Sequence, residues 1–153
     1  MVSCLMGDST ALASAIVRCC LNIRFASSEH RDFFLDMMSE AKRNDCYHRA
    51  FFYVMGIAPE TRANIRQMFD FGQDCIEPEG MNGGWQTSGT VRVCRLAFNL
   101  WNGYTDPEHS NAYSPEDLFC CEFGPYFMEG IKIRYPEYCR ELPPARKQEA
   151  PAR

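Results

Sequence analysis

Cysteine and histidine are the residue types in this chain with the widest chemistry. The chain contains nine cysteines and three histidines, and structural zinc sites use such residues as paired ligands two to four positions apart. Cys46 and His48 approach that spacing, but both lie in a predicted helix, where positions i and i+2 face different sides. The adjacent cysteines at 19–20 and 120–121 cannot easily both bind one ion. We therefore expect no metal and no other cofactor, and we interpret the cysteines as buried apolar thiols.

A cysteine could also act as a nucleophile, with His48 or His109 as its base. A reactive thiol needs a neighbouring base or a helix end that lowers its pKa. No cysteine has such a signature in its local sequence, and Cys94, which precedes Arg95, falls on the apolar side of its predicted helix. The sequence therefore predicts no catalytic residue, although a site assembled only in three dimensions remains open.

Phosphate binding is suggested by a glycine-rich stretch that precedes a helix. The glycines lie at positions 80, 83, 84 and 89. Their spacing matches neither a P-loop nor the dinucleotide fingerprint, and no lysine lies near them. The pair before Trp85 more simply predicts a tight turn.

The strongest candidate for binding is a polar seam on an otherwise apolar helix within residues 83–104. At 100° per residue, four side chains fall on one narrow sector of this helix. The predicted partner-binding residues are these four and a tryptophan that precedes them: Trp85, Arg92, Arg95, Asn99 and Asn102. Arginine and tryptophan are enriched at binding hot spots, so Trp85 and Trp101 would act as anchors at the edge of the seam.

The alternative is that the seam is closed from inside the protein. Two arginines on one face repel each other unless acceptors answer them. The acids of the flanking loops that could do so are Asp70, Asp74, Glu77 and Asp106.

These residues must be positioned by helices, because helical spacing of apolar residues recurs along the chain. Capping residues and breakers set the ends of about six helices beyond the N-terminal segment. The predicted helices cover residues 28–41, 45–55, 59–71, 88–104, 115–122 and 125–134. A further helix is expected over 9–22, and a short β-pair from extended pieces around Ile23 and Cys75 to Glu77.

The fold class predicted is all-α, as a single compact multi-helix domain with that short two-stranded element. A domain of roughly 150 residues hides about 70% of the surface of its unfolded chain, so one substantial core is expected. The chain divides into an N-terminal helical extension (1–21), a helical core domain (22–139) and a flexible tail (140–153), which contains three of the chain's nine prolines.

The charge pattern limits the partners. The net charge is −4 and the isoelectric point is near 5.4, which argues against direct nucleic-acid binding, since that requires a clustered positive surface. No segment reaches the roughly 20 apolar residues of a membrane span. An odd number of cysteines without a signal peptide favours a reducing, cytoplasmic setting. We expect a monomer or a homodimer.

Six segments of the chain resemble a family of small uncharacterised proteins. They are IRFASSEHRDFF (23–34), FFYVMGIAPETRANI (51–65), GWQT (84–87), RLAFNLWNGY (95–104), YSPEDLF (113–119) and IRYPEY (133–138). The family occurs in Gram-positive gut bacteria and their mobile elements. The resemblance implies a bacterial cytosolic setting and mobile-element cargo, and it brings no reaction, cofactor or catalytic residue.

We therefore expect a non-enzymatic protein-binding module. By analogy of size, charge and setting, its most specific candidate role is that of an anti-CRISPR protein, an inhibitor that binds a CRISPR nuclease of the host. The alternative is a small metal-dependent or hydrolytic enzyme.

Overall fold

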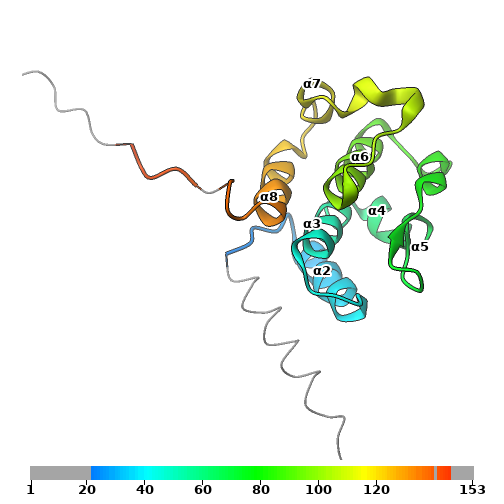
Figure 1. The fold of residues 1–153 in the computed structure, drawn as a ribbon, viewed down its shortest axis with the longest axis horizontal. Helices are drawn as coiled ribbons and strands as arrows, with labels where there is room; N and C mark the ends of the chain where they lie inside the picture. The colour runs from blue at the N-terminus through cyan, green and yellow to red at the C-terminus, as the bar shows by residue number, and fades with distance from the viewer. Residues whose placement is uncertain (1–21, 140, 146–153) are drawn as a thin grey trace, which may run out of the picture.

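The computed structural model of the chain describes residues 22–139 and 141–145. The helices are α2 (Ser28–Glu40), α3 (Cys46–Met55), α4 (Pro59–Ala63), α5 (Ile65–Met68), α6 (Ser88–Asn102), α7 (Pro115–Leu118) and α8 (Gly124–Arg134), with 3-10 helices η1 (Pro78–Asn82) and η2 (Pro107–Tyr113). The strands β1 (Phe69–Asp70) and β2 (Cys75–Ile76) form an antiparallel pair. The all-α prediction with a short two-stranded element is confirmed (Figure 1). The helix predicted over 9–22 lies outside the described residues.

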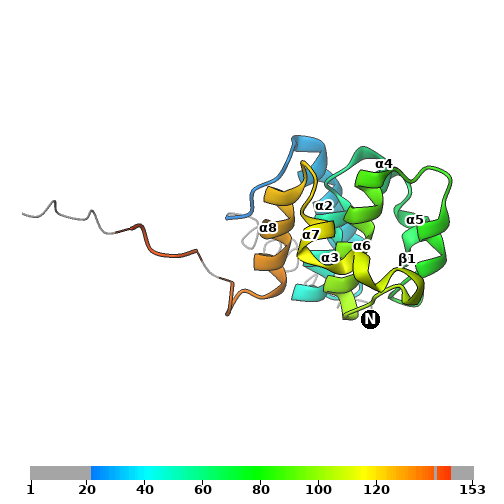
Figure 2. The same cartoon turned by 90° about the horizontal axis from the view of Figure 1, so that it is seen from above.

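Helix α3 is the centre of the fold. Every residue from Ala50 to Ala58 is buried, and α3 packs against α2, α6 and α8 (Figures 1 and 2). A helix that is apolar on nearly all sides has to be surrounded in this way. Helix α8 approaches α3 closely because its Gly130 faces α3. A Cβ at position 130 would lie 2.6 Å from Val54 Cγ2.

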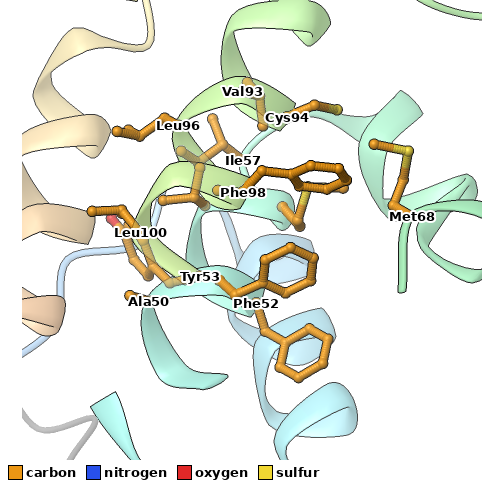
Figure 3. Close-up of a cluster of buried hydrophobic side chains, with 14 of the residues drawn as sticks. Ala50, Phe52, Tyr53, Ile57, Met68, Val93, Cys94, Leu96, Phe98 and Leu100 are labelled. Carbon is orange, nitrogen blue, oxygen red and sulfur yellow. The ribbon is translucent and has the colours of Figure 1, made fainter. Parts of the chain in front are cut away.

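The core is formed mainly by α3 and α6. Figure 3 shows one cluster in which Ala50, Phe52 and Tyr53 of α3 are drawn together with Leu96, Phe98 and Leu100 of α6. Cys94 also lies in this core, and burial raises the pKa of its thiol to about 12. The interpretation of the cysteines as buried holds for Cys94 alone among the described ones, because Cys120 is exposed and the others are half-buried.

Helix α6 begins at the predicted residue and ends at Asn102, two residues before the end of the predicted range 88–104. Thr87 and Thr90 form a capping box in which each side chain accepts from the other residue's backbone N–H. Gly103 ends the helix at a φ of 78°, in the left-handed region that glycine adopts without steric cost. Both signals depend only on neighbouring residues.

The helix predicted over 59–71 is wrong in its length. It breaks at Asn64, whose φ and ψ are −108° and 15°, and α5 ends at Met68. The chain then turns into the β-hairpin, where the backbone N–H of Glu77 donates to Met68 O at 2.9 Å. The β-pair therefore contains Cys75, as predicted, but its partner is Phe69–Asp70 and not the segment around Ile23.

Two further boundaries differ from the prediction or extend it. The helix predicted over 115–122 ends at Leu118, and residues 119–123 form turns before α8 begins at Gly124. Residues 141–145 are exposed and have no regular secondary structure.

In the part of the chain that the structure describes, no helix combines the length and apolar character that a membrane span requires.

Candidate functional site

The predicted seam runs along α6 toward the segments that follow it. Arg92 donates from Nε to Asp117 O at 2.6 Å and from Nη1 to Ser88 O at 3.0 Å. The bond to Asp117 O ties α6 to α7. Among the described residues, main-chain carbonyl oxygens hold the guanidinium, and no loop acid pairs with it.

Asn99 and Asn102 close the other end of the seam. Asn99 Nδ2 donates to Tyr104 O at 3.2 Å, and Asn102 Oδ1 accepts from the backbone N–H of Tyr104 at 3.1 Å. Both side chains therefore hold the turn that follows α6. The hydrogen bonds of both side chains are made within the chain, to the backbone of Tyr104. A role of these residues in partner binding stays a prediction.

Arg95 and Trp85 differ from the other seam residues. Arg95 Nε and Trp85 Nε1 are enclosed, and neither has a hydrogen-bond partner among the described residues. The Arg95 guanidinium lies 6.0 Å from the centre of the Tyr113 ring in η2. The structure thus places four of the five predicted residues along α6 and Trp85 in the loop before it, packed against the core.

The acid Asp74, proposed to close the seam, instead binds a histidine. His48 on α3 is fully buried, and its Nε2 lies 2.8 Å from Asp74 Oδ1. Its Nδ1 lies 2.7 Å from Asp45 Oδ1. Each ring nitrogen thus lies within hydrogen-bonding distance of a carboxylate oxygen. The imidazole then has no free nitrogen with which to act as a base or as a metal ligand.

Asp45 has a second task at the start of α3. Its Oδ1 also accepts from the backbone N–H groups of Tyr47 and His48, at 3.1 and 3.0 Å, and so caps the helix. Burial raises the pKa of Asp45, but the hydrogen bonds from His48 and the charges of His48 and Arg43 outweigh it, and the net pKa is lowered.

Beside this network lies a hollow of about 220 Å³, lined by Arg43, Asp45, Tyr47 and Trp101. We call it the Asp45 hollow. Trp101 is held edge-on against the buried His48 ring, with 4.7 Å between the ring centres. Arg43 is 68% exposed, and its nitrogens lie 3.7 Å from Asp45 Oδ2 and 3.5 Å from Asp74 Oδ2.

Next to the hollow, Arg134 at the end of α8 is stacked between two tyrosines. Its guanidinium carbon lies 3.8 Å from the centre of the Tyr47 ring and 4.7 Å from that of Tyr135. Its Nε donates to Leu100 O of α6 at 2.8 Å, and its Nη1 lies 3.7 Å from Cys46 Sγ of α3. One side chain thus joins the ends of α3, α6 and α8.

The tyrosines around Arg134 are exposed although they are large. Tyr47 is 43%, Tyr135 39% and Tyr138 85% exposed. A second hollow, of about 210 Å³, is lined by Cys46, Arg134, Tyr135, Pro136, Glu137 and Tyr138. We define the aromatic face as Tyr47, Trp101, Arg134, Tyr135 and Tyr138.

Of the five residues of the aromatic face, the sequence predicted only Trp101 as a binding residue. The neighbouring contact between Asp45 and His48 could have been predicted. The two residues stand three positions apart at a helix start, where a capping carboxylate can also reach a ring nitrogen. No comparable local signal links Arg134 to Tyr47.

Two other places in the described structure carry side chains of catalytic or binding types. His109 is exposed and pairs through Nδ1 with Asp106 at 2.8 Å. A hollow of about 350 Å³ at the start of α6 includes Cys120 and the glycine at 89, but Glu60 and Glu122 also line it and disfavour a phosphate. Among the described residues, no group of three or more His, Cys, Asp or Glu side chains is arranged to hold a metal ion.

Comparisons with known proteins add one finding. Residues 21–147 match a family model described as a family of unknown function (DUF6075). This range contains the core domain predicted over 22–139. No curated protein and no solved structure matches the chain.

Proposed function

The chain belongs to the family of unknown function DUF6075, and we propose that it is a non-enzymatic protein-binding module that docks through the aromatic face. The observation that carries this proposal is the set of exposed tyrosines arranged around the stacked guanidinium of Arg134. Tyrosine, tryptophan and arginine are the residue types that dominate binding hot spots.

The rigidity of the face supports the proposal. Arg134 is stacked on two rings and bonded to Leu100 O, so it loses little conformational freedom when a partner docks. Tyr47 belongs to α3, and Trp101 packs against the buried His48. The two hollows beside Arg134 offer recesses for a partner's side chains.

The enzymatic alternative finds less support in the described residues. The Asp45–His48–Asp74 group, whose imidazole is fully buried, uses both imidazole nitrogens for its own hydrogen bonds. A histidine that acts as a general base needs a ring nitrogen within reach of the substrate proton. In this geometry His48 acts as a clamp between α3 and the β-hairpin.

The proposal includes a bacterial, cytoplasmic, mobile-element setting, and it includes a CRISPR nuclease of the host as the partner to test first. The chain carries a net charge of −4. An acidic protein complements the basic groove with which a nuclease holds nucleic acid, and this speeds association. The contribution of Trp85, Arg92, Arg95, Asn99 and Asn102 to that binding is tested in the same assay.

The experiment is affinity capture with the full chain, from bacterial lysates with and without co-expressed CRISPR nucleases. The test variant is Tyr135→Ala with Tyr138→Ala, since both side chains are exposed and their loss leaves the core intact. Met128→Ala on α8, at 51% exposure, is the matched control. We expect a partner that the control retains and the double variant loses at an unchanged melting temperature. The proposal is refuted by the absence of any partner or by equal capture with the double variant.

A further inference from the structure

We propose that the Asp45 hollow binds an arginine side chain of the partner. This inference rests on the proposed protein-binding function and specifies the chemistry of one contact. It follows from the carboxylate oxygens beside the hollow, from the arginine that now faces them, and from the aromatic walls.

Asp45 and Asp74 each direct one carboxylate oxygen toward the buried His48 and the other toward Arg43. Asp45 Oδ1 accepts from two backbone N–H groups and lies against His48, and Asp74 Oδ1 lies against the other nitrogen of His48. Their Oδ2 atoms both face Arg43. Two acceptor oxygens, fixed by the bonds of their partner atoms, are therefore presented side by side.

Arg43 shows that a guanidinium fits this position, and it holds the position weakly. Its contacts with the two outer oxygens are long, at 3.7 and 3.5 Å, and the side chain is 68% exposed. The carboxylates themselves are only 32% and 13% exposed, so the weakness of the pairs comes from the long contacts and from the solvated arginine. A guanidinium delivered by a partner can take the same place when Arg43 swings into solvent.

The aromatic walls of the hollow favour a flat cation. Tyr47 and Trp101 line it, and a cation close to such rings is attracted by their electron-rich faces. The chain uses this contact with its own arginines, since Arg134 lies 3.8 Å from the Tyr47 ring centre and Arg66 4.4 Å from that of Phe71. A planar guanidinium also spans two carboxylate oxygens, which a single ammonium does less well.

The test uses Nα-acetyl-arginine amide as the probe, with its neutral isostere Nα-acetyl-citrulline amide and with Nα-acetyl-lysine amide. Binding to the full chain is followed by nuclear magnetic resonance, through the indole N–H of Trp101, assigned in a Trp85→Phe variant, and the backbone amides of Tyr47 and His48. We expect saturable shifts with the arginine probe, weaker shifts with the lysine probe, and none with the citrulline probe.

Three variants separate a specific site from general charge attraction. Arg43→Ala removes the competing guanidinium and should raise the affinity about two- to fivefold. Arg31→Ala is the control, since it removes the same charge from an exposed pair on α2. The neighbouring His30 bonds Tyr53 O, so this pair lies beside the other end of α3, away from the hollow. Arg31→Ala should change nothing. Asp74→Asn should weaken binding at least threefold and still fold, since asparagine tolerates the φ of 61° at this position.

The inference is overturned if arginine and citrulline probes shift the same resonances equally, or if Arg43→Ala and Arg31→Ala change the affinity alike. Its failure is distinct from failure of the proposed function. If a partner is captured through Tyr135 and Tyr138 but the chain does not bind the arginine probe, only the inference fails. If the chain binds the arginine probe but captures no partner, the arginine site stands and the docking function fails.

Discussion

Asp74 offers the sharpest test of how the hairpin is held on α3, because two separable effects meet at this residue. It accepts from the fully buried His48 at 2.8 Å, and it adopts a φ of 61°, the positive value found at no other non-glycine residue in the described part of the chain. Asparagine keeps both the acceptor and the backbone preference. Glycine keeps only the backbone preference, and alanine keeps neither. The free energy of unfolding should therefore fall in the order wild type, Asn, Gly, Ala.

The magnitudes follow from the geometry. Asp74→Asn should cost about 1 kcal/mol or less, because a neutral acceptor replaces an ionised one at an unchanged site. Asp74→Gly leaves a buried imidazole N–H without its acceptor, which costs about 2 kcal/mol. Asp74→Ala adds the left-handed backbone of a residue with a Cβ, about a further 1 kcal/mol.

The assay is urea unfolding at pH 7, followed by tryptophan fluorescence, which is sensitive here because Trp101 packs edge-on against His48. The slope of the unfolding free energy against urea concentration should be the same for wild type and the three variants. Under that condition, differences between the urea midpoints report differences in stability. An Asn variant as unstable as the Gly variant would refute the role of the hydrogen bond. An Ala variant at least as stable as the Gly variant would refute the backbone argument.

Two further predictions concern packing and pH. Gly130→Ala on α8 should lower stability by about 1–2 kcal/mol despite the better helix propensity of alanine, because its Cβ would lie 2.6 Å from Val54 Cγ2; Gly84→Ala, with open space around its Cβ, is the thermal-melting control and should change little. Burial lowers the pKa of His30 from its ordinary 6.5 to about 4, although its bond to Tyr53 O acts in the opposite direction. The unfolded chain therefore binds the extra proton between these values, so stability should fall as the pH drops from 6.5 to 4. Urea midpoints should show this slope reduced in His30→Gln, and an unchanged slope would contradict the assignment.

Helix starts were predictable because a cap involves only a few neighbouring residues. Ser27 caps α2, Asp45 caps α3, and Thr87 caps α6, all at predicted positions. Ser114 and the following proline begin α7 in the same way. The ends of weaker helices were not predictable, because at Met68 a hairpin competes for the same backbone groups and its hydrogen bonds replace those of a longer helix.

The polar seam shows how far periodicity reaches. The 100° spacing correctly groups Arg92, Arg95, Asn99 and Asn102 along one helix, but it contains no information on what covers them. Arg92 bonds Asp117 O, which lies 25 positions further along the chain. The choice of main-chain oxygens over acids depends on the path of the segments after α6, and no local pattern specifies that path.

From the sequence one could predict a helical domain, the starts of its main helices and an acidic charge, because these depend on local geometry and composition. The three-dimensional packing of the chain, in contrast, determined that Asp74 bonds His48, 26 positions away, and that Arg134 reaches Cys46 across 88 positions. It also decided that Tyr47, on a helix whose other aromatic residues are buried, faces solvent. Arg134 meets Tyr47 and Cys46 only where α3, α6 and α8 end side by side, and Asp74 reaches His48 only where the β-hairpin lies against α3. Both meeting points depend on how the apolar faces of the elements pack, which no local pattern specifies.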